Sequence, residues 1–70
     1  MKDEFLAPAQ AVKEYPVLGS TASLAERRWR GSGPDYIKTG EGRGGRVWYR
    51  RSAIEAWLEA QTVRTGGAAA

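Results

Sequence analysis

The stretch STASLAERRWR, from Ser20 to Arg30, decides how the rest of this chain can be arranged. Ser20 is a typical helix N-cap residue, because its hydroxyl oxygen can accept a hydrogen bond from a free backbone N–H in the first turn. Gly31 follows the stretch and can adopt the left-handed backbone that ends many helices. The pattern therefore predicts a short helix that begins at Ser20 and ends at Arg30.

Two stripes of this predicted helix differ in character. At about 100° per residue, one stripe is polar and carries Ser23, Arg27 and Arg30. The other is apolar and carries Ala22, Ala25 and Trp29, and we expect Trp29 to lie in the core or at its edge. The polar stripe is either a binding surface or an ordinary solvated face, and the helix alone does not distinguish the two.

A second helix is expected upstream. Pro8 suits the first position of a helix that runs to about Glu14, and Pro16 ends it by forcing the preceding residue out of the helical region. Gly19 then supplies a turn into the next helix, and Val17 and Leu18 are expected in the core. Two helices joined by a short turn with a glycine form the outline of a helix-turn-helix.

Downstream of Pro34, two short strands are expected, Tyr36 to Thr39 and Arg46 to Arg50, joined as a hairpin by the glycine-rich tract GEGRGG at residues 40–45. Alternation along the second strand places Val47 and Tyr49 on the core side together with Ile37. The opposite face then carries an exposed row of Arg46, Trp48 and Arg50.

The last predicted helix begins with the sequence Ser-Ala-Ile-Glu at residues 52–55, which matches a capping box in which Ser52 is the N-cap. Ile54, Trp57 and Leu58 have helical spacing and should supply the core, and the helix should end near Gln61 or Val63. We therefore predict a single α+β domain over residues 1–62, with three helices and a two-stranded antiparallel hairpin. Residues 63–70 are expected to be a disordered tail.

Composition excludes several kinds of function. A chain of 70 residues without Cys or His has no disulfides and no thiolate or imidazole metal ligands. It is also too short for a deep catalytic cleft, and no motif for catalysis or nucleotide binding is present, so we expect neither an enzyme nor a cofactor. No apolar run approaches the roughly 20 residues that cross a bilayer, and we expect a cytoplasmic protein that contacts no membrane.

The positive charge is concentrated in the middle of the chain. Eight of the 11 Lys and Arg residues lie between Arg27 and Arg51, where only Asp35 and Glu41 oppose them. Seven of those eight are Arg, which forms bidentate contacts with phosphate and guanine. A basic centre between mildly acidic ends is typical of a protein that binds a polyanion.

Several motifs in order resemble one family. The strings SLAERRWRGSGPDYIKTG and GRVWYRRSAIEAWLEA resemble the small winged-helix proteins of the excisionase and AlpA type, which are related to the MerR DNA-binding domain. The resemblance covers residues 5–61 and implies a winged helix-turn-helix fold that binds double-stranded DNA. Position 27 is usually apolar in this family, and here it is Arg27. Either Trp29 takes over its packing or the helix is slightly rotated.

Within this family, the resemblance favours an excisionase, also called a recombination directionality factor. Such a protein binds attachment-site DNA, bends it and directs a tyrosine integrase towards excision, with neighbouring copies of itself as further partners. One alternative is an AlpA-like or MerR-like transcription regulator. Another is a phage packaging or antitoxin-type adaptor that uses the winged domain to contact proteins.

The resemblance and the charge together assign candidate DNA contacts. On the predicted recognition helix the candidates are its cap, its polar stripe and its remaining charges: Ser20, Thr21, Ser23, Glu26, Arg27, Arg28 and Arg30. We interpret Arg28 as a phosphate or solvent contact, and Glu26 mainly as the intrahelical partner of Arg30. On the predicted wing the candidates are its cations: Lys38, Arg43, Arg46 and Arg50. Trp48 is interpreted as a protein contact or as the partner of a neighbouring arginine in a cation–π pair.

Overall fold

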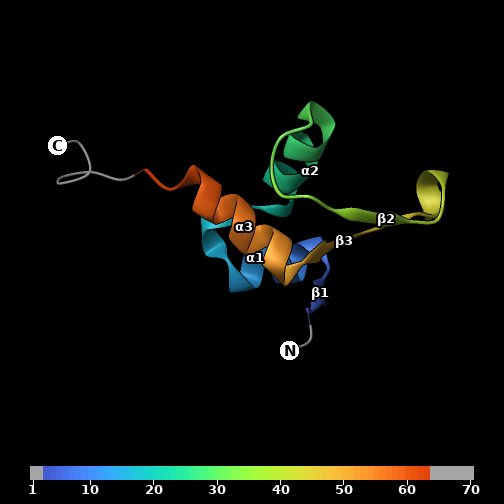
Figure 1. Ribbon diagram of the computed structural model, residues 1–70. Helices are drawn as coiled ribbons and strands as arrows, with labels where there is room; N and C mark the ends of the chain where they lie inside the picture. The colour runs from blue at the N-terminus through green and yellow to red at the C-terminus, as the bar shows by residue number, and fades with distance from the viewer. Residues whose placement is uncertain (1–2, 64–70) are drawn as a thin grey trace, which may run out of the picture.

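The computed structural model describes residues 3–63. Over these residues the chain forms three α-helices, two 3₁₀ turns and a three-stranded antiparallel sheet (Figure 1). This architecture confirms the predicted α+β class. In chain order the elements are β1 (Phe5–Leu6), α1 (Pro8–Glu14), η1 (Pro16–Leu18), α2 (Thr21–Arg30), β2 (Ile37–Thr39), η2 (Gly42–Gly44), β3 (Arg46–Arg50) and α3 (Arg51–Gln61).

The first two helices begin and end as their sequences predict. Pro8 occupies the first turn of α1. At the start of α2, the Ser20 Oγ accepts a hydrogen bond from the Ser23 N–H at 3.1 Å. Gly31 ends α2 with a φ of 78°, a conformation that costs glycine little because it has no Cβ. The turn between the two helices contains the 3₁₀ turn η1, which the sequence reading did not predict.

The predicted capping box at the start of α3 is wrong. Ser52 lies inside the helix, and its N–H donates to Asp3 Oδ1 at 3.0 Å while its hydroxyl donates to Asp3 Oδ2. Glu55 does not reach back to the helix start and instead accepts a hydrogen bond from the Tyr15 hydroxyl at 2.7 Å. A carboxylate near a helix N-terminus is favoured by the helix dipole, and here the N-terminal segment supplies it.

The sheet has one more strand than predicted. β3 is central, with β1 on one side and β2 on the other, and both pairs are antiparallel. In β1, Phe5 lies opposite Arg50 and Leu6 lies opposite Tyr49. A strand of two residues is too short to show alternation in the sequence, so only its pairing with β3 identifies it.

The register corrects the predicted position of Ile37. Tyr49 is buried and Val47 packs against the core, as expected. Ile37 lies opposite Trp48, however, and residues directly opposite each other project from the same face of a sheet. Ile37 therefore belongs to the outer face with Trp48 and not to the core face.

Six of the eight elements each contribute one buried side chain to the core. The buried apolar residues come from β1, α1, η1, α2, β3 and α3: Leu6, Ala11, Leu18, Leu24, Tyr49 and Ile54. Trp57 and Leu58 pack against this cluster, as predicted, and so does Tyr15. Val17 and Trp29 were expected in or beside the core, and both expectations are wrong because their side chains are 74% and 87% exposed.

Arg51 joins three parts of the fold. Its guanidinium donates from Nε to Glu4 at 2.8 Å, from a terminal nitrogen to Glu14 at 2.6 Å and from the other to the Tyr15 hydroxyl at 3.0 Å. Its backbone N–H donates to the Glu4 carbonyl at 2.9 Å. One side chain at the start of α3 thus holds the segment before β1 and the end of α1.

The predicted tail at residues 63–70 lies outside the described residues except for Val63, which is 81% exposed. Within the described range, none of the helices is long and apolar enough to cross a membrane.

We predict that Arg51→Met lowers the thermal unfolding midpoint clearly, because it removes the cation shared by Glu4 and Glu14. Circular dichroism melting measures this. Arg46→Met is the matched control, since Arg46 is exposed and forms no ion pair within residues 3–63. Equal midpoints for the two variants would contradict the role of Arg51.

We also predict that acid destabilises the protein through Asp3 and Glu14. The Ser52 hydrogen bonds lower the pKa of Asp3 below 3.8, and the hydrogen bond from Arg51 lowers the pKa of Glu14 below 4.5. Because both carboxyls bind protons more readily in the unfolded chain, their contribution is present above pH 4.5 and is lost as the pH falls through the lowered values. Urea unfolding at a series of pH values should show this decline. The double variant Asp3→Asn, Glu14→Gln should show a shallower one, and an equally steep decline would assign the acid sensitivity to other groups.

Candidate nucleic-acid interface

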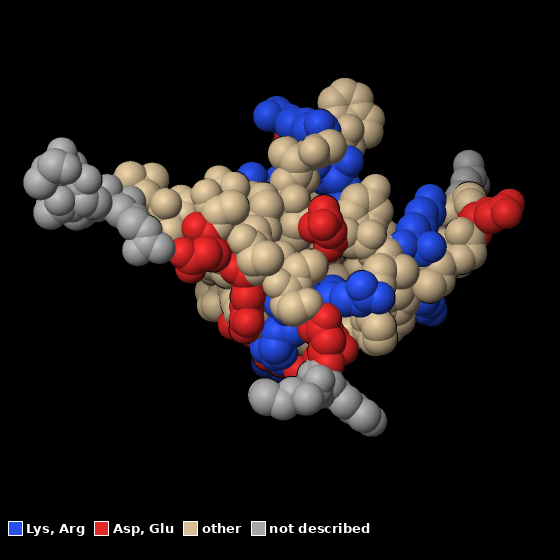
Figure 2. Space-filling view, viewed as in Figure 1, with Lys and Arg blue, Asp and Glu red and all other residues tan. Residues whose placement is uncertain are grey.

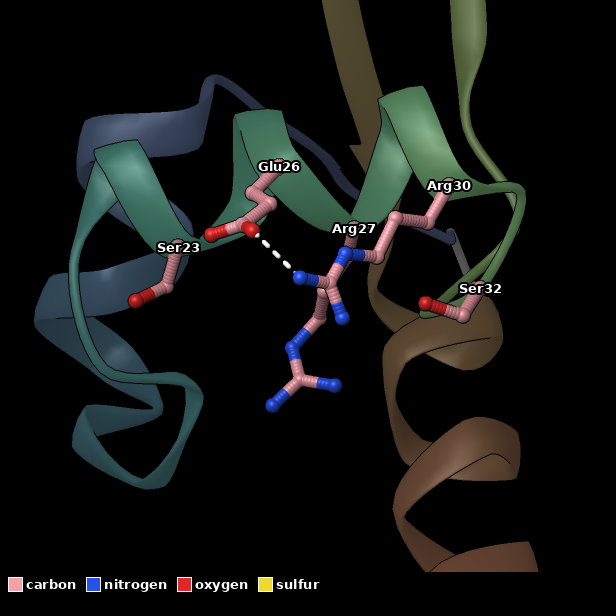
Figure 3. Close-up of a pocket in the computed structure, with 5 residues that line it drawn as sticks. All are labelled: Ser23, Glu26, Arg27, Arg30 and Ser32. Atoms are coloured by element: carbon pink, nitrogen blue, oxygen red, sulfur yellow. Dashed lines mark hydrogen bonds and ion pairs between the residues drawn. The ribbon is translucent and has the colours of Figure 1, made fainter.

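The predicted polar stripe of α2 forms a real surface. Ser23, Arg27 and Arg30 line a hollow of about 180 Å³ together with Glu26 and Ser32, which follows the helix (Figure 3). Figure 3 shows the Arg30 side chain lying back along α2, while Arg27 points away from the helix axis. The structure therefore brings together two guanidinium groups and two hydroxyls on one side of α2.

Glu26 is the intrahelical partner of Arg30, as its spacing predicts. Arg30 donates to a Glu26 carboxylate oxygen at 2.7 Å, and both side chains are more than half exposed. An exposed pair of this kind contributes about 0.3–0.5 kcal/mol to helix stability. The pair is weak enough for Arg30 to exchange this carboxylate for another anion.

Arg27 occupies the position that is usually apolar in the resembled family, and it packs there in a third way that we did not predict. Its guanidinium carbon lies 5.1 Å from the Trp57 ring centroid, so the cation stacks on an aromatic side chain of α3. A Cβ at Gly33 would lie 3.0 Å from the Arg27 Cβ, so the glycine leaves the room that this side chain needs. Trp29 does not replace Arg27 in the packing. Arg27 is half-buried and joins α2 to α3.

Arg28 contacts the sheet. It donates to the Tyr49 hydroxyl at 2.9 Å, and its guanidinium carbon lies 5.9 Å from the Tyr36 ring centroid. The hydroxyl of the buried Tyr49 thus has a charged partner, and Arg28 is held between α2 and β3. Its predicted contact with phosphate or solvent is at most a secondary role.

The beginning of α2 presents two further candidates. Thr21 is exposed. Ser20 acts as the helix cap, and its hydroxyl also donates to the Ser23 Oγ at 3.2 Å. Ser20 and Ser23 therefore lie together at the end of α2 where backbone N–H groups are free, which is where an anion is best received.

The hairpin of β2 and β3 projects away from the helices (Figure 1). Lys38 lies opposite Val47 and Arg46 lies opposite Thr39, so the two cations are on opposite faces of the hairpin. Arg50 is nearer the globule, where its guanidinium carbon lies 5.6 Å from the Phe5 ring centroid. The side chain of Arg43 lies outside the described part of the structure, so its predicted contact stays a prediction.

Charge is unevenly distributed over the molecule. In Figure 2, Lys and Arg side chains lie beside uncharged ones on α2 at the top and follow the hairpin at the right, where acidic atoms mark the tip. Most other Asp and Glu side chains visible on this face lie lower, around α1, α3 and the N-terminal segment. Asp3, Glu4 and Glu14 account for part of the acidic region through their bonds to Ser52 and Arg51. The cations visible in this view therefore lie mainly on α2 and the hairpin.

Trp48 lies in an apolar hollow on the outer face of the sheet. The hollow measures about 310 Å³ and is lined by Phe5, Ile37, Thr39 and Trp48. Phe5 was not among the predicted site residues, because its contact with the hairpin depends on the unpredicted strand β1. The arginine next to this hollow, Arg50, stacks on Phe5 and not on Trp48.

Trp29 is, with Val17 and Ile37, a residue whose position the sequence did not predict correctly. On a helical wheel it lies about 140° from the buried Leu24, so the signal for an outward position was present in the spacing.

No group of His, Cys, Asp and Glu side chains within residues 3–63 could hold a metal ion.

Comparison with known proteins adds no further assignment. No family model, no curated protein and no solved structure matches this chain.

Proposed function

We propose that this protein is a winged helix-turn-helix domain that binds double-stranded DNA, with α2 in the major groove and the β2–β3 hairpin as the wing. The observation that supports this best is that Lys and Arg side chains lie on both α2 and the hairpin, two elements that the resembled family uses on DNA. The order of a helix, a short turn, a second helix and a hairpin agrees with the proposal.

The structure divides the candidate contacts into two groups. Arg30, Ser23 and Thr21 are available to base edges or phosphates, since Arg30 has only an exposed intrahelical partner. Arg27 and Arg28 are half-buried and pack on aromatic side chains. Arg30 is therefore the best candidate for a bidentate contact with guanine, and the cations of the wing are candidates for phosphate contacts.

Within DNA-binding proteins, the proposal is an excisionase. Its support is the resemblance of the motifs from Ser23 to Gly40 and from Gly45 to Ala60. One module of this size buries roughly 600–1,000 Å² of protein surface on DNA, so adjacent copies or a contact with an integrase would be needed for tight binding. Protection mapping separates this proposal from a transcription regulator, because an excisionase protects an attachment site and a regulator protects a promoter.

The adaptor hypothesis keeps one specific observation in its favour. The hollow around Trp48 is almost entirely apolar, and Phe5 at its edge is 54% exposed. Such a surface fits an apolar side chain of a protein, either a neighbouring copy on DNA or another partner.

We predict that Arg30→Ala weakens binding to a selected duplex about tenfold and relaxes base preference at one position, whereas Arg46→Ala weakens binding evenly and reduces the salt slope by about 1. The duplex is first selected from a random library with the whole chain, and affinity is then measured by gel shift at several salt concentrations.

Glu26→Gln is the control for Arg30. It removes the same ion pair but leaves the guanidinium, so it should bind at least as tightly as the wild type. If both arginine variants kept wild-type affinity on every duplex, the proposed function would be wrong.

We further predict that Trp48→Ala folds normally and keeps its affinity for a duplex with one site, but loads less cooperatively on a duplex with tandem sites. Sedimentation or gel shift on the two duplexes measures the difference. Reduced single-site binding would place Trp48 on the DNA itself. Binding of a protein partner with an affinity that does not change with salt would favour the adaptor instead. Phosphate contacts make the affinity for DNA fall steeply as the salt concentration rises.

A further inference from the structure

The outward side of α2 carries an apolar stripe. Ala22, Ala25 and Trp29 are exposed, and their spacing of three and four residues places them on one stripe. Leu24, which is buried, marks the inward side of the helix. The indole of Trp29 is 87% exposed, the highest value among the large apolar side chains of residues 3–63.

This stripe borders a cation. Arg30 lines the polar hollow next to the stripe, whereas the guanidinium of Arg28 turns to Tyr49 on β3. Glu26 is the one acidic side chain on α2, and its carboxylate is paired with Arg30. The partner of this face should therefore offer an anionic group to Arg30 and apolar groups to the stripe.

The major groove of DNA meets both conditions. Its walls are phosphates, and the C5-methyl group of thymine is the apolar group that it exposes. The groove is about 12 Å wide and admits an α-helix. Ala22 and Ala25 have short side chains, which allow the α2 backbone to approach the base edges closely.

We propose that Trp29, with Ala22 and Ala25 beside it, contacts thymine methyl groups in the major groove and so determines part of the sequence specificity. This inference rests on the proposed DNA-binding function and extends it to the outward face of α2. Arg30 then contacts a base edge or a phosphate at the side of the groove, and Trp29 contacts the methyl groups at its floor.

The test removes the methyl groups alone. The whole chain selects duplexes from a random library, and each thymine of the selected site is then replaced by deoxyuridine, which differs only in lacking the C5-methyl group. Wild-type protein should lose affinity about fourfold for each methyl group that is contacted. Trp29→Ala should bind the thymine and deoxyuridine duplexes with equal affinity, and this affinity should be lower than that of the wild type for the thymine duplex. Trp29→Phe should keep part of the difference in affinity between the two duplexes.

Val63→Ser is the matched control, since Val63 is 81% exposed and lies beyond α3. This variant should keep the full difference in affinity between the thymine and deoxyuridine duplexes. Because Trp29 has few contacts to lose, Trp29→Ala should unfold at the wild-type midpoint, so a change in binding cannot be assigned to misfolding.

The outcomes separate this inference from the proposed function. Tight binding to selected duplexes without any difference between thymine and deoxyuridine would overturn the role of Trp29 and leave the DNA-binding proposal intact. A full difference retained by Trp29→Ala would also overturn it, because another residue would then read the methyl groups. Failure to bind any duplex at low salt would overturn both proposals.

Discussion

The fold depends on the contacts of Arg51. Its guanidinium and backbone N–H together hold the segment before β1 and the end of α1 against the start of α3. Asp3 completes the same region by bonding to Ser52 in the first turn of α3. Because the core cluster of residues 3–63 has only six buried apolar members, such polar contacts fix how the elements meet. They also neutralise one end of the molecule, which leaves the excess positive charge on α2 and the hairpin.

The arginines of the basic centre have different tasks. Arg51 pairs with carboxylates, Arg27 stacks on Trp57, and Arg28 donates to the buried Tyr49. Each of these guanidinium groups is held by aromatic or acidic side chains of another element. Arg30 and Arg46 remain accessible, so the surface offered to an anion is smaller and better defined than the count of basic residues indicates.

The aromatic residues show a similar division. Tyr49 and Trp57 support the core, whereas Trp29 on α2 and Phe5 on β1 remain largely exposed. Exposed aromatic side chains of this size are costly for a small domain unless something covers them. Trp29 lies on the helix that also carries Arg30, whereas the hollow near Phe5 is lined mainly by apolar side chains. The two surfaces therefore suit different partners.

The sequence by itself determined the local elements. The limits of α1, α2 and β3 follow from Pro8, Ser20, Gly31 and alternating side chains, because caps, proline and glycine act on backbone within one turn of themselves. Tertiary structure alone decided the strand β1, the Asp3 cap of α3, the outer position of Ile37 and the division of the arginines. Each of these depends on partners that lie far away in the chain, such as Glu4 and Arg51 or Arg28 and Tyr49. Only packing decides which distant groups meet, and local spacing carries no information about that.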